Sequence, residues 1–417
     1  MIKILLPLLC FSPSQAIGVY EAQPKEVGTV LDDDGGWCWF QDERAVVVDG
    51  TLYVGTVSTG YNNESRRGDI NVIMHDLGNG ESRTVEIDDR LERDDHNLPA
   101  LLAQDDGVLA VWSKHGTDLQ TRFGTISQSG ELIGSGTYTS DIRDGHKVTY
   151  ANLFAMPDDC VVNFYRGLGW DPNAMVSKDG GKSWEDKGQL LGGPGRPYVR
   201  YAQDQDGHIH FTATEQHPRN FDNSIYHGVL QGSTVRNSFG DAKGVLGSNP
   251  PVPESLSRVF QGDADNVAWC NDIEINADNQ PVIVYSVQKG SAGLPVAQGG
   301  DDHRYRYAWF DGHSWHDHEV GFAGSRLYPR EDDYTGLICI DPANTSTVYF
   351  SADVHPETGE ALEHYEIWKG ETEDAGESWL ITAITENSSS DNIRPMVPIS
   401  DTLILLWMEG TYRTYTN

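Results

Sequence analysis

The feature that most constrains the fold of this chain is a two-strand unit that recurs seven times. Each copy joins two runs rich in β-branched and aromatic residues through a turn of Asp, Asn, Gly or Pro. The turns lie about 50 to 70 residues apart, near Asp49, Asp106, Asp158, Asp206, Asn279, Asn344 and Asp401. One such interval holds a four-stranded antiparallel sheet with its loops, and helical periodicity is hard to find between the copies.

We therefore predict an all-β fold, a seven-bladed β-propeller of four-stranded antiparallel blades, because small sheets in series close most easily into a ring. One β-sandwich or several is the alternative that the strand pattern leaves open. The last copy stops at Asn417 with too few residues for four strands. The N-terminal segment is thus expected to complete the last blade.

One complete blade can be traced between His146 and Trp184. Its third and fourth strands are joined by a hairpin, Ser177 to Trp184, that fits the Asp-box pattern S-x-D-x-G-x-x-W at every defined position. A second box spans Thr372 to Trp379. Such hairpins lie on the outer part of a propeller. We therefore expect them to stabilise the blades and to take no part in catalysis.

The first sixteen residues, MIKILLPLLCFSPSQA, combine one lysine, a short apolar run and small residues at the end. This pattern predicts a signal peptide over residues 1–16, cleaved after Ala16, and a single catalytic propeller domain over residues 17–417. No later apolar run has the length of a membrane-spanning helix. We expect an exported monomer, extracellular or periplasmic, without a membrane partner. Disulfides and isolated thiols both remain open for the scattered Cys38, Cys160, Cys270 and Cys339.

The chain carries 63 acidic and 30 basic residues and a formal net charge of −33. Such a charge repels a phosphate backbone, so nucleic acid is excluded as a partner. The simplest interpretation is a solubilising acidic surface. An anionic substrate would need a local basic pocket, with the rest of the surface charge screened by salt.

In a propeller, the start of each first strand and the end of each second strand lie at the same face, around a central funnel. In blades two to four, this rule gathers histidines, a tyrosine and arginines at the rim: His96 and His115, then Tyr150 and Arg166, then Arg200 and Arg219. The first four belong to two adjacent blades. Tyr150 and Arg166 begin and end one antiparallel pair, so a tight turn brings them together. A single rim histidine is more often a structural hydrogen-bonding group than a catalytic one. The Tyr150–Arg166 pair fits a structural contact at the sheet edge as well as it fits a catalytic pair. The set of four carries more weight than its members.

Histidines, a tyrosine and an arginine are the groups required to cut a uronic acid polymer by β-elimination. The C5 proton is weakly acidic until an arginine or histidine neutralises the neighbouring carboxylate. A base then removes that proton while an acid protonates the leaving glycosidic oxygen. Histidine can act as a general base near neutral pH, and tyrosine can act as a general acid.

The blade pattern, the Asp-boxes and the run TEQHPRNFDNSIYH (Thr214–His227) resemble the secreted propellers with BNR-type repeats. Among these, the chain resembles the ulvan lyases of polysaccharide lyase families 24 and 25 over essentially all of residues 17–417. These families carry two histidines about twenty residues apart, followed by a tyrosine and an arginine sixteen apart. Here His96 and His115 are nineteen apart, and Tyr150 and Arg166 are sixteen apart.

The resemblance implies a lyase that cleaves ulvan, a sulfated rhamnose–uronic acid polymer of green algae, into unsaturated uronyl oligosaccharides without a catalytic cofactor. This acidic sulfated polysaccharide would be its partner. We expect Tyr150 and His96 to share the acid and base roles. Arg166 and His115 would neutralise the carboxylate. Candidates for holding the sulfate and the neighbouring sugars are Arg200, Arg219, Asn223 and Tyr226.

A structural metal is a separate expectation, since the related propellers are similar in carrying one. His208 and His210 alternate on one face of a strand, and His227 lies on the neighbouring strand. Together with Cys270, at the start of the next blade, they suit tetrahedral zinc better than calcium. Packed polar side chains without a metal are the alternative.

Two other functions remain open. Sialidases also carry Asp-boxes on propellers, and such a hydrolase needs an arginine cluster and a tyrosine–glutamate pair, for which Tyr201 and Glu215 are candidates. The arginines available for the cluster are Arg44, Arg166, Arg200, Arg219 and Arg394. The second open function is that of a non-catalytic propeller that binds carbohydrate. Products without a new double bond would favour the hydrolase, and binding without a fall in chain length would favour the binding protein.

Overall fold

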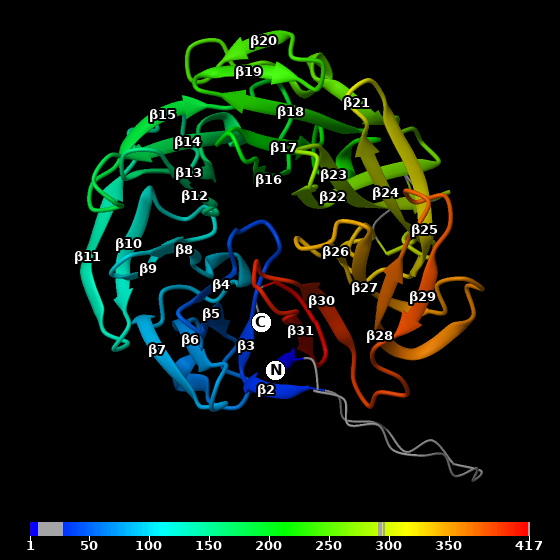
Figure 1. Cartoon of the computed structure of the whole chain (residues 1–417), viewed down its shortest axis with the longest axis horizontal. Helices are drawn as coiled ribbons and strands as arrows, with labels where there is room; N and C mark the ends of the chain where they lie inside the picture. Colours follow the sequence, from blue (N-terminus) through cyan, green and yellow to red (C-terminus); the bar gives the residue numbers. More distant parts are fainter. Residues whose placement is uncertain (7–27, 291–293, 295–296, 416–417) are drawn as a thin grey trace.

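Seven antiparallel sheets follow one another around a central axis in the computed structural model, which describes residues 1–6, 28–290, 294 and 297–415. They run in chain order from blue to red around the ring in Figure 1. The predicted seven-bladed propeller is confirmed, and the β-sandwich alternative is wrong. The helical segments of the described residues are short 3-10 turns, and none is long and apolar enough to cross a membrane.

The first six blades each come from one continuous stretch of chain. The first contains β4 (Ala45–Val48), β5 (Thr51–Ser58), β6 (Ile70–Asp76) and β7 (Ser82–Asp88), with β3 (Gly35–Gly36) also on β5. The second contains β8 (Ala100–Gln104), β9 (Gly107–Ser113), β10 (Gln120–Ser127) and β11 (Leu132–Thr139). The third contains β12 (Leu153–Met156), β13 (Cys160–Arg166), β14 (Pro172–Ser177) and β15 (Glu185–Gln189).

The next three blades follow the same order, and the fourth is enlarged. It contains β16 (Val199–Gln203), β17 (Ile209–Ala213), β18 (Ile225–Gln231) and β19 (Thr234–Asn237), extended by β20 (Ala242–Val245) and β21 (Ser257–Phe260). The fifth contains β22 (Asn266–Ile275), β23 (Pro281–Lys289), β24 (His303–Phe310) and β25 (Trp315–Gly324). The sixth contains β26 (Ile338–Ile340), β27 (Thr347–Val354), β28 (Ala361–Glu371) and β29 (Leu380–Ala383).

The seventh blade unites strands from both ends of the chain. Its order is β30 (Asn392–Met396), β31 (Leu405–Glu409), β1 (Ile2–Leu5) and β2 (Thr29–Asp32). The expectation that the N-terminal segment completes the last blade is confirmed. Hydrogen bonds between strands about 400 residues apart in sequence therefore close the ring.

The first residues of the predicted signal peptide form a strand in the structure of the full chain. β1 pairs with both β31 and β2, buries Ile2 and Ile4, and places Lys3 in an ion pair with Glu409. A short alternating apolar run suits this position as well as it suits a leader. The cleavage position after Ala16 lies outside the described residues and stays a prediction. Cleavage there would remove β1 from the blade.

Packing of blade against blade explains why the second strands have nearly unbroken apolar sequences. β9 is buried along its whole length, because neighbouring blades cover both of its faces. The outermost strand of the same blade, β11, has no fully buried residue. The core therefore follows the inner strands around the ring.

The Asp-boxes form hairpins between third and fourth strands, as predicted. In the first box, the hydroxyls of Ser177 and Ser183 donate to the Asp179 carboxylate at 2.8 and 2.6 Å. The N–H of Gly181, whose φ of 91° suits a glycine, donates to Ser177 Oγ at 2.7 Å. Trp184 Nε1 donates to the Gly181 carbonyl, and the indole ring is buried. The box thus fastens the outer edge of the blade.

An aromatic plug that we did not predict, residues 37–40, fills the middle of the ring. Its four side chains are each at most 2% exposed. Trp39 packs edge-on against Trp269 and Tyr334, and the Phe40 ring lies 4.8 Å from that of Tyr198. In Figure 1 the dark blue chain between β3 and β4 reaches this central position. The plug gives the funnel an apolar floor. The described cysteines Cys38, Cys160, Cys270 and Cys339 are free thiols.

Candidate active site

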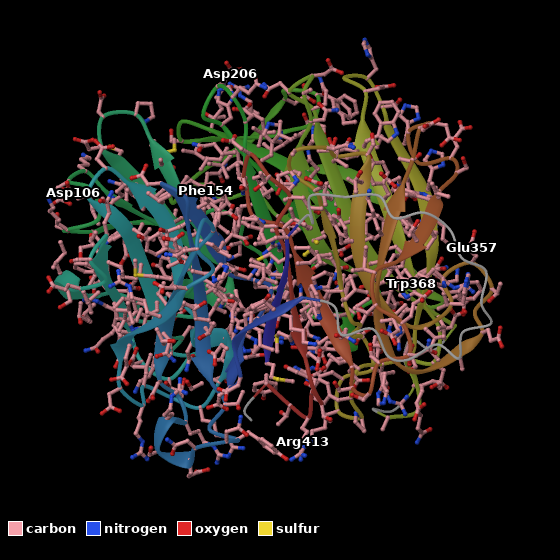
Figure 2. The ribbon with its side chains drawn as sticks, turned by 60° about the horizontal axis from the view of Figure 1, so that its bottom comes forward. Asp106, Phe154, Asp206, Glu357, Trp368 and Arg413 are labelled. Atoms are coloured by element: carbon pink, nitrogen blue, oxygen red, sulfur yellow. The ribbon has the colours of Figure 1, made fainter. Side chains whose placement is uncertain are left out.

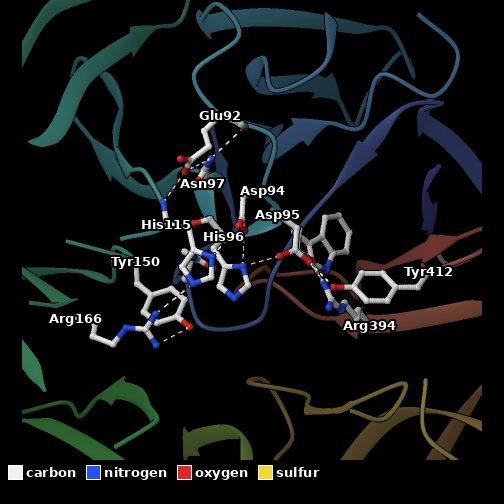
Figure 3. A network of polar contacts seen from close by, with 12 residues as sticks. Glu92, Asp94, Asp95, His96, Asn97, His115, Tyr150, Arg166, Arg394 and Tyr412 are labelled. Carbon is white, nitrogen blue, oxygen red and sulfur yellow. Dashed lines mark hydrogen bonds and ion pairs between the residues drawn. The ribbon is translucent and has the colours of Figure 1, made fainter. Parts of the chain in front are cut away.

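Four predicted residues come together at one side of the funnel (Figure 3). The rings of His96 and His115 stack with 3.9 Å between centroids, and the Tyr150 ring lies 5.6 Å from His96. Arg166 Nη2 lies 3.3 Å from His115 Nε2, and Arg166 Nη1 donates to the Tyr150 hydroxyl at 3.5 Å. The guanidinium carbon also lies 4.8 Å from the Tyr150 ring centroid, within cation–π range. The four side chains therefore form one continuous cluster.

The antiparallel edge of the third blade positions Tyr150 and Arg166. Thr149 and Arg166 exchange backbone hydrogen bonds of 3.0 and 2.8 Å just before β12 begins. Tyr150 has a φ of 70°, in the left-handed region that costs energy for a tyrosine. Such strained residues concentrate at functional sites, where the surrounding structure holds them. The structure thus brings the two strand ends together, as the sequence predicted.

One carboxylate, Asp94, holds both histidines. It is the N-cap of the 3-10 turn η2 (Asp95–Asn97) and accepts the backbone N–H of His96 at 3.0 Å. Its oxygens lie 2.6 Å from His96 Nδ1 and 2.7 Å from His115 Nδ1. Asp94 therefore fixes the orientation of both rings. The predicted set omitted Asp94, although an aspartate directly before a turn is a recognisable N-cap signal.

Asp95 links His96 to the C-terminal segment (Figure 3). Its Oδ1 lies 2.8 Å from His96 Nδ1, and its Oδ2 accepts hydrogen bonds from Arg394 at 2.8 Å and from the Tyr412 hydroxyl at 2.9 Å. The Asp95 N–H donates to the Tyr415 carbonyl at 2.8 Å. The Tyr415 ring lies edge-on to both imidazoles, 5.5 and 5.7 Å away. No local sequence signal connects residues 95 and 415, so sequence reasoning missed this wall of the site.

The two histidines have opposite pKa shifts. Burial disfavours the charged form of His96, but the carboxylates of Asp94 and Asp95 raise its pKa well above the usual range. Burial and the charge of His96 lower the pKa of His115 to about 4. His96 is therefore a cation at neutral pH. His115 is a neutral ring, because two stacked imidazoles cannot both carry a charge cheaply.

The tyrosine is held in its protonated form. Burial raises the pKa of Tyr150 far above the usual range, and the charges of Arg166 and His96 offset this only in part. A protonated phenol beside a guanidinium is suited to donating a proton to a developing oxyanion. The cluster thus contains a proton donor, a neutral ring with a lone pair, and two cations.

A pocket of about 430 Å³ adjoins the cluster. Asp94 and Asp95, which hold the histidines, line it together with the C-terminal segment 410–415. Tyr61, Arg67 and Arg93 contribute to its lining from other loops. Its size falls within the roughly 300–1,000 Å³ of ligand-binding pockets, so it can accommodate a sugar unit beside the cluster.

Of the residues predicted to hold neighbouring sugars, only Arg219 reaches the surface, with its side chain 38% exposed and paired with Glu331. Arg200 is buried, where it pairs with Asp42 at 2.6 Å and Asp272 at 3.0 Å. The structure also buries the other two. Asn223 exchanges hydrogen bonds with the Gln216 backbone, and the Tyr226 hydroxyl donates to Glu215 at 2.9 Å. Arg200, Asn223 and Tyr226 therefore stabilise the fold, and the structure does not place them at the pocket.

The predicted zinc ligands do not converge. His210 Nδ1 lies 3.1 Å from His227 Nε2, and His208 and His210 both contact Asp204. Cys270, however, donates its thiol to the Tyr198 carbonyl in the core, beside the aromatic plug. Within the described ranges, no group of three ligand atoms closer than 4.8 Å includes Cys270. The four residues do not fit a tetrahedral zinc site, because the Cys270 thiol bonds within the core and not beside the histidines.

The arrangement that a sialidase would need is also not formed. Arg44, Arg200 and Arg394 are buried, and their partners are Asp42, Asp272 and Asp95. Tyr201 is stacked on Phe164 at 4.6 Å, and Glu215 bonds to Tyr226 instead of Tyr201. The arginines therefore do not combine into a carboxylate-binding cluster on the described surface.

Comparison with known proteins agrees with the repeat architecture. Among solved structures, this chain is similar to a PL25 ulvan lyase bound to -[GlcA(1-4)Rha3S]-, with a TM-score of 0.67 and 13% identity over 92% of each chain. An ulvan lyase structure of the same family gives a TM-score of 0.66 and 13% identity over 91% of this chain and 92% of that one. The polysaccharide lyase Uly1 gives 0.53 and 11% identity over 94% of each chain. These likenesses show the propeller fold.

A search of curated proteins finds no match. The family model described as "BNR repeat-containing family member" matches residues 53–323, from β5 to β25, which is more than half of the chain. The repeated blades, the Asp-box hairpins and this match lead to one conclusion: the chain belongs to the BNR repeat-containing family.

Proposed function

We propose that this protein is a polysaccharide lyase that cleaves ulvan by β-elimination at the uronic acid. The observation that carries the proposal is the convergence of His96, His115, Tyr150 and Arg166 beside a pocket. These side chains supply every group that the reaction needs. The similarity to ulvan lyase structures, one of them with a glucuronate–rhamnose sulfate ligand, adds support.

The protonation states refine the roles that the sequence suggested. His96 is the buried cation, so it is better suited than His115 to neutralise the uronate carboxylate, together with Arg166. His115 is neutral, and its Nε2 lone pair becomes available as a base when Arg166 turns to the carboxylate. The incoming negative charge would also raise the pKa of His115 toward a useful value.

The bond changes then balance without a cofactor. His115 takes the C5 proton, and the electron pair of the C5–H bond forms the C4=C5 double bond. The C4–O bond breaks, and the leaving glycosidic oxygen takes a proton from the Tyr150 hydroxyl. Solvent then removes the proton from His115 and restores the phenol, leaving an unsaturated uronyl end on one product.

In this proposal the enzyme is exported after cleavage behind Ala16 and acts as a monomer on a polymer outside the cell. The acidic surface leaves recognition of the polyanion to local cations, His96 and Arg166. Salt in the surroundings screens the remaining charge.

The test is incubation of the purified protein with ulvan while the ultraviolet absorbance of the new double bond is followed. We expect a steady rise, and a loss of about 100-fold or more in Tyr150→Phe, since a proton-transfer group contributes on the order of 10² to 10⁴ in rate. Arg258→Ala, an exposed substitution on β21, serves as the matched control. A folded protein that gives no absorbance change would refute the proposal.

A further inference from the structure

We propose that Trp170 and Tyr198 are positioning residues, which together with Tyr150 form an aromatic cage around Arg166. The cage holds this guanidinium without a carboxylate partner and so keeps its positive charge free for the carboxylate of the substrate. This inference rests on the proposed function and deepens it, because both residues act on the substrate through Arg166.

Arg166 differs from the other buried arginines in the groups that contact it. Four arginines are buried in the described part of the chain. Three of them form ion pairs with aspartates: Arg44, Arg200 and Arg394. Arg166 is 5% exposed, and among the described residues it forms no ion pair and its Nε has no hydrogen-bond partner. Because an uncompensated buried charge is costly, other groups must stabilise this cation.

Three aromatic rings contact the guanidinium in place of an acid. Its carbon lies 4.8, 5.2 and 5.6 Å from the ring centroids of Tyr150, Trp170 and Tyr198, within the range of about 6 Å for cation–π attraction. Arg166 Nη1 also donates to the hydroxyls of Tyr150 and Tyr198, at 3.5 and 3.3 Å. A second cation, Arg196, lies 5.4 and 5.5 Å from the rings of Trp170 and Tyr198, so this neighbouring charge is also positive.

This environment suits the movement that the proposed mechanism requires. Arg166 must leave His115 Nε2, which is 3.3 Å away, and turn to the uronate carboxylate (Figure 3). A carboxylate partner would hold the guanidinium by short charge-assisted hydrogen bonds and would compete with the substrate. The bonds to the two tyrosine hydroxyls exceed the usual length of about 2.9–3.0 Å, and a ring face attracts the cation without binding a particular N–H. The cage therefore holds Arg166 in place and leaves its N–H groups available.

The fold fixes Tyr198 as the inner wall of the cage. Tyr198 is buried, its N–H donates to Thr214 Oγ1 at 3.2 Å, and its carbonyl accepts the Cys270 thiol at 3.4 Å. Its ring lies 4.8 Å from Phe40 of the aromatic plug and 5.3 Å from Trp269. Contacts on the main chain and on the ring therefore fix the position of the hydroxyl that accepts from the guanidinium.

Trp170 is the outer wall of the cage, in a turn four residues after Arg166. Its φ of 65° is in the left-handed region, which is unusual for a bulky side chain and persists only where the surrounding structure enforces it. The Asp144 carboxylate holds this turn, since it accepts the Gly169 N–H at 2.8 Å and lies 2.6 Å from His146 Nδ1. The His146 ring lies edge-on to the indole at 5.3 Å. The indole is 38% exposed, so it can be replaced without opening a cavity in the core.

The first experiment compares Trp170→Glu with Trp170→Gln, because the two new side chains have the same shape and differ in charge. Reaction with ulvan is followed through the ultraviolet absorbance of the new double bond. We expect Trp170→Gln to lower kcat/KM about tenfold through loss of the cation–π contact. Trp170→Glu should lower it about 100-fold or more, because the new carboxylate pairs with Arg166 and competes with the substrate. Equal kcat/KM values for the two variants would overturn the proposal.

Glu357→Gln is the matched control for this change of one charge. Figure 2 shows Glu357 at the outer edge of the molecule, on the loop between β27 and β28. Because Glu357 is exposed and far from the cluster, kcat/KM should stay within about twofold of wild type. A difference as large as that between the two Trp170 variants would show that the charge acts through the general field of the protein, and the cage would then be wrong.

Tyr198→Phe tests the second wall, since it keeps the ring and removes the hydroxyl. We expect kcat to fall about tenfold because Arg166 loses an acceptor that positions it. Tyr305→Phe is the control, because it also removes a buried hydroxyl, one that donates to the Ser351 carbonyl at 2.8 Å. Both variants should lose similar stability, measured as melting temperature, and only Tyr198→Phe should lose activity. Full kcat in Tyr198→Phe would overturn the role of this residue.

A further measurement does not depend on catalysis. Nuclear magnetic resonance of isotope-labelled arginine reports the Nε–H of Arg166, which is identified by its absence in Arg166→Lys. In the free protein we expect this resonance to move in Trp170→Gln, because the ring current of the indole is lost, and to stay in place in Glu357→Gln. If the wild type gives no new double bond with ulvan, the proposed function fails, yet the resonance still decides the cage. An unchanged resonance in Trp170→Gln would refute it.

Discussion

The imidazole rings of His96 and His115 stack face to face, with 3.9 Å between centroids and 10° between planes, and both contact Asp94 through Nδ1. One carboxylate between two rings sets both orientations but compensates for only one positive charge. The more buried ring, His96, takes that charge with further help from Asp95, and His115 stays neutral. This division gives chemically similar side chains different roles.

Asp94→Asn should impair catalysis far more than folding. The amide can accept an N–H from only one of the two rings and carries no charge, so the pKa of His96 falls and the other ring must change its tautomer or lose its bond. We expect a loss of about 100-fold or more in kcat, comparable to removing a residue that orients a catalytic group. Steady-state kinetics with nuclear magnetic resonance of the imidazole nitrogens measures both effects. Asp141→Asn, on an exposed ion pair with Arg143, is the control. Normal kcat in Asp94→Asn would contradict the assigned role.

The lowered pKa of His115 predicts an acid-dependent loss of stability. The folded ring titrates near pH 4, whereas an unfolded histidine titrates near pH 6.5. Between these values the unfolded chain binds a proton that the folded chain does not. The contribution of this ring is therefore complete above about pH 6.5 and is lost as the pH falls toward 4.

His115→Gln removes that titration. Its melting temperature should consequently fall less than that of the wild type between pH 6.5 and 4.5, as measured by circular dichroism. Parallel curves for the two proteins would show that His115 is not shifted. The activity of the wild type should also decline as His115 becomes protonated, because the ring then lacks the lone pair needed for a base.

Trp184→Ala should lower the stability of the fold and leave catalysis unchanged. The indole is buried, bonds to the Gly181 carbonyl and lies 6.3 Å from Phe123 of the neighbouring blade. Its removal leaves a cavity, and we expect a loss of about 3–5 kcal/mol in the free energy of unfolding. KM and kcat at 25 °C should stay within about twofold of wild type, since the box holds the outer edge of the blade. A large change in kcat without loss of stability would place the Asp-box in the site after all.

The pairing of β1 in the closing blade predicts that loss of the N-terminal residues lowers the stability of the protein. A protein that begins at Ile17 lacks the ladders to β31 and β2 and the buried Ile2 and Ile4. Burial of each isoleucine contributes about 1.5–3 kcal/mol, so this form should melt several degrees below the full chain. Calorimetry of the two forms measures the difference, and the intact mass of the exported protein shows which form occurs. Equal melting temperatures would mean that β1 contributes nothing to the blade.

The parts of the site that the sequence predicted are those set by local strand geometry. Tyr150 and Arg166 flank one hairpin, so strand alternation and a tight turn determine that they meet. The same rule placed Arg200 at the rim, because it lies near the start of β16. The rule cannot tell that buried Asp42 and Asp272 draw this guanidinium inward. Sequence position predicts the strand end, and the partners from other blades decide where the side chain goes.

The residues that sequence reasoning missed depend on contacts between distant segments. Tyr415 reaches the histidines from the far end of the chain, and Phe40 of the plug packs 5.7 Å from Tyr150. Cys270 illustrates the opposite error. Its position after the histidine strands suggested a shared metal, but it contributes to the core around the plug. Strand patterns specify a blade, whereas these contacts arise only when the ring has closed.

The closure of the ring by both chain ends has a consequence for the working lifetime of the enzyme. Asp95 at the entrance to the second blade binds Tyr412 and Tyr415, which directly follow β31 of the closing blade. If heat or pulling force separates β31 from β1, these tyrosines leave the histidine pair while the other six sheets stay folded. Inactivation should then precede the loss of bulk β-structure. In the uncleaved chain, the seam between β31 and β1 would set the durability of the catalyst.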